Sequence, residues 1–434
     1  MRELRGRDLL LVGFTLFSMF FGAGNLIFPP FLGAQAGSGT WYAMAGFCLS
    51  AIGFPILGVI AVARCGGLGQ LAGRVHPAFA SVFTILIYLS IGPGLAIPRT
   101  ASTSFEMAAP LLGGASPLLQ ALYSLAFFAL AVAVALRPEK LTDRLGKILC
   151  PILIALIAAL FLGCVLRPVA GGYGSPEAAY QSAPAIQGFL GGYNTMDTIA
   201  ALNFGAIIAL NIRSRGVTEE RRVVRGTVRA GWIAGAVLLA VYAMLAHVGA
   251  LSGAAFPGAA NGAQVLTRLA DALFGPPGSV LLAAIFLIAC LNTCIGLLSS
   301  CSDYFHRLLP RLSYRAWVVF FALLSMVISN IGLTGILRLS TPILNAIYPP
   351  ALVLILLSLA GERLAERRLV YPLAVGLTCL ESVAAALQGA GLLPGLGALL
   401  DPIPLADLGL GWLLPAAAGL LLGLLLSPRS RRAG

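Results

Sequence analysis

FGAGNLIFPP, residues 21–30, interrupts the first long apolar run of the chain, which extends from about residue 9 to residue 34. A run of this length can span a bilayer. Gly22, Gly24 and Asn25 are poor helix formers, so we expect the helix to unwind here. Lipid cannot satisfy the backbone N–H and C=O groups that such a break frees. The half-helix that follows would present bare N–H groups to the middle of the membrane, where they would suit a carboxylate.

A second interruption, GGYNTMDT at residues 191–198, lies in the sixth apolar run. Asp197 is the only acid deep in this run, and a carboxylate in a membrane interior is costly and usually functional. The two interrupted runs each begin a block of five, and matching breaks in two halves indicate the binding site of a transporter. Two other interpretations stay open. The glycines would also allow close helix packing, and Asp197 would also serve to pair with a buried donor and hold the helices together.

The composition indicates a membrane protein. Of the 434 residues, 59% are hydrophobic and 10% are charged, whereas soluble proteins carry roughly 25% charged residues. We therefore expect an all-α integral membrane protein surrounded by the lipid bilayer. Twelve runs have about the length of a transmembrane helix, and they lie near residues 9–34, 41–63, 78–98, 117–136, 148–166, 186–212, 230–251, 279–302, 316–333, 339–360, 370–389 and 410–427.

The positive charge predicts an orientation. The net charge is +12, but the basic residues form short clusters between apolar runs, which is not the pattern of a nucleic-acid-binding face. When alternate connections are assigned to opposite sides, 24 of the 28 Lys and Arg residues fall on the side that holds both termini. The positive-inside rule then predicts that both termini are cytoplasmic. The remaining four basic residues are Arg99, Arg167, Arg268 and Arg338.

The eighth run has polar residues on its inner half, in LNTCIGLLSSCSD at residues 291–303. Thr293, Gly296 and Ser300 share one helical face by their spacing. Hydroxyl and carbonyl oxygens are hard ligands that suit a small cation. The alternative is that these hydroxyls donate to carbonyls of their own helix. In the tenth run, Pro342, Pro349 and Pro350 predict a kinked helix.

Four motifs resemble those of the bacterial branched-chain amino acid:cation symporter family: FGAGNLIFPP (21–30), GYNTMDT (192–198), GLLSSCSDYF (296–305) and LSTPILNAIYPP (339–350). The resemblance implies a multi-pass protein of the bacterial inner (plasma) membrane that takes up leucine, isoleucine and valine. It implies a sodium ion or a proton as the coupling ion, with no other cofactor.

That family is similar, more distantly, to proteins of the LeuT-type fold, in which two five-helix repeats are inverted relative to each other. The resemblance implies a single membrane domain over residues 1–434, with repeat one at about 8–167, repeat two at about 186–360 and two extra helices at about 361–434. It also implies a sodium site formed by carbonyls of the first span and by small and hydroxyl residues of the eighth, namely Ser18, Phe21, Gly296, Ser299 and Ser300.

The expected substrate site lies between the two breaks. The substrate carboxylate would bind the backbone N–H groups of residues 22–25, and the ammonium would meet carbonyls of the sixth span. Asp197 would either stay charged and orient the ammonium or a cation, or carry a proton. The expected substrate-binding residues are Gly22, Ala23, Gly24, Asn25, Tyr193, Thr195 and Asp197.

Two other functions are compatible with part of the pattern. One is transport of another small solute, such as a nucleobase or an inorganic ion. The other is a membrane-embedded transferase, which would need acid–base or metal groups near one membrane face. The three histidines, His76, His247 and His306, are scattered, and no GxSxG, HExxH or Walker A motif occurs. We therefore expect a protein that is not an enzyme.

Overall fold

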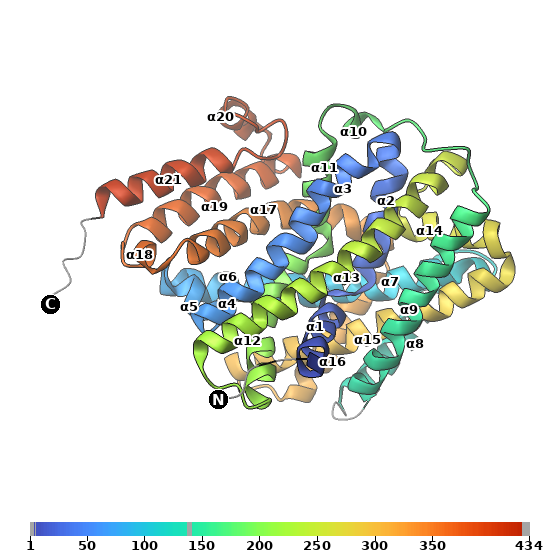
Figure 1. Ribbon diagram of the computed structural model, residues 1–434, viewed down its shortest axis with the longest axis horizontal. Helices are drawn as coiled ribbons and strands as arrows, with labels where there is room; N and C mark the ends of the chain where they lie inside the picture. The colour runs from blue at the N-terminus through green and yellow to red at the C-terminus, as the bar shows by residue number, and fades with distance from the viewer. Residues whose placement is uncertain (1–3, 5, 137–140, 428–434) are drawn as a thin grey trace.

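A computed structural model describes residue 4 and residues 6–136 and 141–427, and these residues form helices and loops without a β-strand (Figure 1). The basic residues Arg2, Arg5, Arg137, Lys140, Arg429, Arg431 and Arg432, which entered the predicted orientation, lie outside these ranges. The α-helices are α1 (Gly6–Phe20), α2 (Ala23–Ala36), α3 (Thr40–Cys48), α4 (Phe54–Cys65), α5 (Leu68–Gly73), α6 (Pro77–Leu89), α7 (Ala96–Ala108), α8 (Pro117–Ala135), α9 (Leu141–Leu166), α10 (Ala178–Ser182), α11 (Pro184–Gly192), α12 (Asp197–Ser214), α13 (Glu220–Ala255), α14 (Gly262–Phe274), α15 (Pro276–Leu308), α16 (Tyr314–Ser329), α17 (Leu333–Leu359), α18 (Glu362–Ala365), α19 (Val370–Gly389), α20 (Gly397–Leu400) and α21 (Leu413–Leu426).

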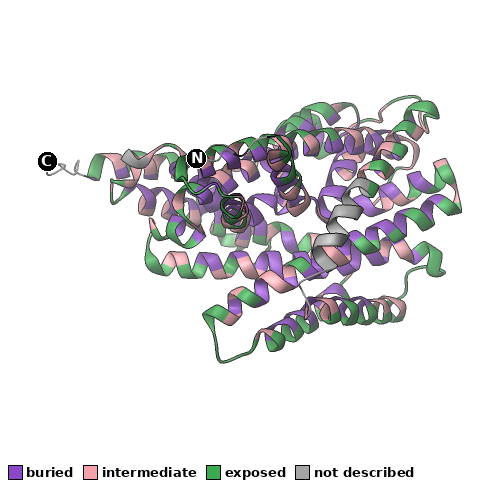
Figure 2. Cartoon of the chain, turned by 60° about the horizontal axis from the view of Figure 1, so that its bottom comes forward, coloured by how far each residue is buried: buried purple, intermediate pink, exposed green. Residues whose placement is uncertain are grey.

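Many of these helices can cross a membrane. Within the described residues, 7 helical stretches are long and apolar enough, and the number rises to 8 if the bent pair Pro184–Thr195 and Asp197–Ser214 forms one span. Three shorter apolar helices lie at Ile154–Leu166, Tyr314–Ser329 and Leu413–Leu426. Large apolar side chains such as Trp232 and Leu425 are 73% and 81% exposed. Figure 2 shows such exposed positions along the outer faces of the helices, as expected where lipid replaces water.

The helix α13 forms a long central contact with α2, α4 and α1 (Figure 1). Glycines allow the backbones to approach closely, as in other membrane helix pairs. A Cβ atom added at Gly249 would lie 2.0 Å from the Pro30 carbonyl oxygen, and one at Gly33 would lie 2.1 Å from the Ala246 carbonyl oxygen. The half-helix α2, which follows the first break, is therefore fixed against α13.

The helices α11 and α12, on either side of the second break, pack against α3 and α4 respectively. A Cβ at Gly188 would lie 1.8 Å from the Ala43 carbonyl oxygen. Between α3 and α4 the chain forms a π-helical turn, Leu49–Gly53. Within it, the Ser50 hydroxyl donates to the Phe189 carbonyl (2.6 Å), and the Ser50 carbonyl accepts from the Thr198 hydroxyl (3.0 Å). These contacts hold the residues of the second break in place.

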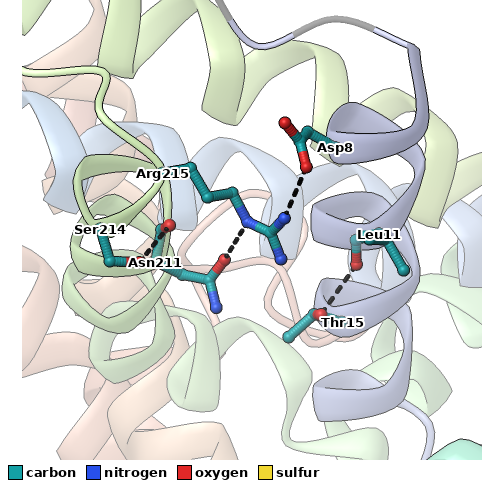
Figure 3. A network of polar contacts seen from close by, with 6 residues as sticks. All are labelled: Asp8, Leu11, Thr15, Asn211, Ser214 and Arg215. Atoms are coloured by element: carbon teal, nitrogen blue, oxygen red, sulfur yellow. Dashed lines mark hydrogen bonds and ion pairs between the residues drawn. The ribbon is translucent and has the colours of Figure 1, made fainter.

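The C-terminal helices α19 and α21 pack against each other, and α19 packs against α17, at one edge of the molecule (Figure 1). The helix α17 is described as one element with Pro342, Pro349 and Pro350 inside it. Figure 3 shows a polar contact between α1 and the end of α12, where the Arg215 guanidinium binds the Asp8 carboxylate of α1 (2.9 Å) and the Asn211 side chain (3.2 Å). This partly exposed pair contributes little to stability, but it connects α1 to the residue that follows α12.

The packing of α13 on α2 generates a prediction. Gly249→Ala places a Cβ against the Pro30 backbone, which cannot rotate away as a side chain could. We expect the free energy of unfolding of the purified protein to fall by about 1–3 kcal/mol, measured by thermal or denaturant unfolding in detergent. Gly376→Ala is the matched control, because no atom lies within 4 Å of its added Cβ. Equal unfolding curves for the two variants would contradict this account of the α2–α13 contact.

Candidate functional site

The first break separates α1 from α2 at Phe21 and Gly22. Gly22 has an extended backbone (φ −114°, ψ −169°), and its N–H lies 2.9 Å from the Phe20 carbonyl oxygen and 3.2 Å from Asn25 Oδ1. Asn25 thus satisfies part of the break from within the next half-helix. The N–H groups in the first turn of a helix have no partner within that helix. The first N–H groups of α2 are therefore donors directed towards the space that precedes the helix.

The second break lies between α11 and α12, which are bent by 50° relative to each other. A single 3-10 turn, Tyr193–Thr195, is followed by Met196 with a left-handed backbone (φ 64°), which is uncommon for a residue other than glycine. Asp197 is the first residue of α12, and its N–H donates to Thr195 Oγ1 (3.3 Å). The positive end of the α12 dipole therefore lies beside the Asp197 carboxylate and stabilises its charge.

The two breaks meet at a buried hydrogen-bonded group. Asn25 Nδ2 donates to Asp197 Oδ2 (2.5 Å) and to the hydroxyl oxygen of Tyr242 on α13 (2.5 Å). The Tyr242 hydroxyl also lies 3.5 Å from Asp197 Oδ2. All three side chains are buried. The structure therefore brings Asn25 and Asp197 together from helices 172 positions apart in the sequence, and it adds Tyr242, which no sequence motif had indicated.

A third interruption supplies a further charged residue, Arg99. The π-helical turn Ser90–Gly94 separates α6 from α7, and Gly92 within it has a non-helical backbone. Arg99, on α7, is only 4% exposed. Its Nη1 donates to the Asn194 carbonyl (2.7 Å), and its guanidinium lies 5.2 Å from the centre of the Phe28 ring.

This position of Arg99 corrects the sequence prediction, which placed the residue on the outer side at the end of a run over 78–98. One charged residue lowers the local hydropathy, and the predicted run therefore ends before Arg99. The helical stretch continues from Pro77 to Leu112, so Arg99 lies inside it. The Gly92-Pro93-Gly94 sequence in the middle of this stretch is the signal that could have identified both the interruption and the buried arginine.

A cavity of about 60 Å³ lies between the breaks. It is lined by six of the seven expected substrate residues, Gly22, Ala23, Gly24, Asn25, Thr195 and Asp197, together with Arg99, Thr100 and Thr293. The rest of its wall is mainly apolar and consists of Met19, Phe20, Ile91, Ala96, Met196, Ala200, Phe204 and Leu297. Pockets that hold small molecules usually measure about 300–1,000 Å³, so in this conformation the space between the breaks is smaller than such a pocket.

The seventh expected residue, Tyr193, lies apart from this cavity. Its ring stacks on Tyr348 of α17, with the ring centres 4.2 Å apart. The side chain lines a different cavity of about 480 Å³, beside Glu381 and Trp412. Its backbone carbonyl accepts from the Met196 N–H (3.0 Å), so the residue shapes the second break through its main chain.

The five residues of the expected cation site are not gathered in the cavity. Gly296 is exposed, whereas Ser299 and Ser300 are half-buried. The Ser300 hydroxyl donates to the Leu297 carbonyl of its own helix (3.3 Å), which is the alternative that the sequence left open. The cavity is lined by neighbours of the five residues, including Phe20 on α1 and Thr293 on α15. Across the residues that the structure describes, no group of three or more His, Cys, Asp or Glu side chains could hold a metal ion.

The cavity is lined by one basic and one acidic side chain. Arg99 and Asp197 line it together and attract each other electrostatically. Both residues are described by the structure, and they form no ion pair with each other within 4 Å. Asp197 accepts a hydrogen bond from Asn25, and Arg99 donates one to the Asn194 carbonyl. The arrangement can therefore bind a small molecule that carries a negative and a positive group and has an apolar remainder.

The role of Asn25 generates a second prediction. Asn25→Ala leaves the Gly22 N–H and the Asp197 carboxylate without their amide partner in a buried site. We expect the free energy of unfolding to fall by about 1–3 kcal/mol in a denaturant titration. Asn330→Ala is the control, because Asn330 is exposed and its amide donates to the nearby Met326 carbonyl (2.7 Å). If Asn25→Ala unfolds like the wild type, the hydrogen bonds between the breaks do not stabilise the fold.

Comparisons with known proteins identify the family. The model of a family described as branched-chain amino acid transport protein matches residues 5–429. The branched-chain amino acid permease BraB of Bacillus subtilis is 42% identical over 426 residues, which cover 97% of this chain and 96% of the relative. The branched-chain amino acid transport system 2 carrier protein of Pseudomonas aeruginosa is 43% identical over 425 residues, with coverage of 97% and 96%.

Among solved structures, the inward-facing conformation of Mhp1 matches 100% of this chain and 97% of its own, with a TM-score of 0.62 and 14% identity. At that identity the likeness concerns the fold alone, and it supports the LeuT-type fold. The sequence relatives are permeases and carriers rather than enzymes. Both the match over nearly the whole chain and the multi-pass helical structure lead to one conclusion: this chain belongs to the branched-chain amino acid transport protein family.

Proposed function

We propose that this protein is a secondary active symporter that imports leucine, isoleucine and valine by alternating access, driven by a sodium or proton gradient. The observation that carries the proposal is the meeting of two helix breaks, through Asn25 and Asp197, at a cavity with an apolar wall. The names of the sequence relatives support the substrate class. The twelve spans, the two inverted five-helix repeats with broken helices one and six, and the cytoplasmic termini belong to the same proposal.

The substrate would lie between the two half-helices. Its carboxylate binds the N–H groups at the start of α2, from Gly22 to Asn25, since a helix N-terminus favours an anion. Its ammonium meets the Asp197 carboxylate and carbonyls near Thr195. The aliphatic side chain contacts apolar residues such as Phe20 and Phe204. The cavity of about 60 Å³ must enlarge to admit this substrate, so binding requires a second conformation.

The coupling cation would bind between α1 and α15. In the present conformation α1 packs mainly on α13 and α12, while α15 packs mainly on α7, α14 and α16. We propose that α1 and α15 approach each other in another state, in which the carbonyls of Ser18 and Phe21 and the oxygen groups around Gly296, Ser299 and Ser300 surround a sodium ion. A cation that binds one state more tightly than the other shifts the population towards that state, and this difference couples the two fluxes.

Asp197 offers the alternative route of coupling. Its carboxylate lies at the junction of the two breaks, where it would either orient the ammonium or carry a proton across the membrane. The sodium and proton mechanisms thus assign the coupling to different residues.

Imposed gradients separate these mechanisms. We expect purified protein in proteoliposomes to accumulate labelled leucine under an inward sodium gradient or an inward proton gradient. If sodium drives uptake, the double variant Ser299→Ala, Ser300→Ala should raise the sodium concentration for half-maximal uptake about tenfold, whereas exposed Ser214→Ala should not. If protons drive uptake, Asp197→Asn should abolish accumulation. Full accumulation by Asp197→Asn would remove Asp197 from both roles, and no accumulation by the wild type under either gradient would overturn the proposed function.

The apolar wall generates a prediction about selectivity. Leucine has three more carbon atoms than alanine, and each buried CH₂ contributes about 0.8 kcal/mol. We therefore expect alanine to compete with labelled leucine about fiftyfold more weakly than unlabelled leucine does. Isoleucine and valine should compete within about tenfold of leucine. Uracil serves as the nucleobase control, and strong competition by uracil would favour a transporter of another solute.

A further inference from the structure

Arg99 is a buried cation whose donors are not fully used. It lies on α7 within a membrane-spanning stretch and is 4% exposed. A guanidinium has five N–H donors, and the structure gives it one hydrogen bond, from Nη1 to the Asn194 carbonyl (2.7 Å). No carboxylate of the described residues forms an ion pair with it within 4 Å. A charge in a membrane interior is costly unless it is paired, and it usually marks a functional position.

The unused part of the guanidinium lies beside the first turn of α2. A Cβ atom added at Gly24 would be 2.8 Å from Arg99 Nη2. Gly24 therefore leaves the space that the guanidinium needs to reach the helix N-terminus. A carboxylate at this position would accept from backbone N–H groups and from a guanidinium at the same time. Arginine is suited to this task, because its planar fork can bind both oxygens of a carboxylate.

Two partners from the broken helices hold Arg99 in this position. The central carbon of the guanidinium lies over the Phe28 ring on α2, 5.2 Å from the ring centre. Asn194, in the second break, accepts through its carbonyl. Phe28 and Asn194 also line a neighbouring cavity of about 350 Å³. Arg99 thus lines the central cavity and contacts two residues that line the larger one.

The opposite charge lies in the same cavity. Asp197 and Arg99 both line it, and neither neutralises the other by direct contact. A free α-amino acid carries its carboxylate and its ammonium on one carbon atom, so it can bind both groups at once. A neutral solute would offer no charged partner to Arg99 or to Asp197. A buried charge without such a partner is strongly unfavourable.

We propose that Arg99 is the side chain that binds the substrate carboxylate, together with the N–H groups at the start of α2. Asn194 and Phe28 are positioning residues that keep the guanidinium directed at the cavity. This inference rests on the proposed function, since it requires that the substrate is an amino acid. It names the specificity-determining residue that restricts transport to molecules with a free carboxylate.

Leucinol, in which a hydroxymethyl group replaces the carboxylate, provides the test. The binding of leucine and of leucinol is measured by competition with labelled leucine on the full-length protein in proteoliposomes. We expect the wild type to prefer leucine by about a hundredfold or more. Arg99→Gln should weaken the binding of leucine by a similar factor and change the binding of leucinol less than threefold, so that the preference for leucine disappears. For Arg99→Gln, unlabelled leucine and leucinol are compared by isothermal calorimetry if labelled leucine no longer binds measurably.

Two further variants make the result interpretable. Arg268→Gln is the matched control, because Arg268 is an exposed arginine on α14 that also donates to carbonyls, those of Phe256 and Pro257. Its leucine-to-leucinol ratio should equal that of the wild type. Arg99→Lys keeps the positive charge but loses the planar guanidinium that can bind both carboxylate oxygens. Its leucine-to-leucinol ratio should therefore be about tenfold lower than that of the wild type. If size-exclusion chromatography shows that Arg99→Gln does not fold, the ratio of Arg99→Lys is used to test whether Arg99 binds the carboxylate.

The possible outcomes test the role of Arg99 separately from the proposed function. A wild type that prefers leucine, with an Arg99 variant that keeps the preference within threefold, would overturn the role of Arg99 and leave the proposed function standing. A wild type that binds no aliphatic amino acid would overturn the proposed function and the role of Arg99 with it. Loss of the preference in Arg99→Gln, with the ratio retained in Arg268→Gln, supports the assignment.

Discussion

The hydrogen bond between Asn25 and Asp197 joins the two helix breaks around which the rest of the structure is arranged. A backbone that unwinds inside a bilayer has no water to satisfy its polar groups, so the protein must supply the partners. The Asn25 side chain accepts a hydrogen bond from the Gly22 N–H of its own break and donates one to the Asp197 carboxylate of the opposite break. One amide side chain therefore satisfies polar groups of both breaks, and neither break would be as well satisfied alone.

This junction depends on helices that contain no break. Tyr242 reaches Asn25 from α13, and α13 is held against α2 by close approaches at Gly33 and Gly249. On the other side, α3 and α4 carry α11 and α12, and Ser50 contacts both sides of the second break through Phe189 and Thr198. Closely packed helices around interrupted segments suit a transporter, because the packed helices can move as bodies while the breaks change their geometry.

The sequence predicted those features that depend on local chemistry. Glycine and asparagine within an apolar run weaken a helix wherever they occur, so residues 22–25 and 192–198 could be located without tertiary information. Arg99 was misplaced because hydropathy measures the average of a window, and a buried arginine resembles the end of a span in that average. Tyr242 could not be found, because a tyrosine in a long apolar helix carries no local signal. The side-chain direction of Tyr193 was equally out of reach, since it depends on Tyr348 of α17.

The proposed binding mode implies a selectivity that is strong for the carboxylate and ammonium of a substrate and weak for its side chain. Charges and helix termini are directional and lie in a buried site, so a solute that lacks one of its two charged groups leaves a protein charge unpaired. The wall near Phe20, Phe204 and Leu297 offers only apolar contact. One methylene in such a pocket contributes about 0.8 kcal/mol, and leucine and isoleucine contain the same number of carbon atoms. A carrier built in this way would discriminate amino acids from other solutes sharply, yet it would accept several branched aliphatic side chains with similar affinity.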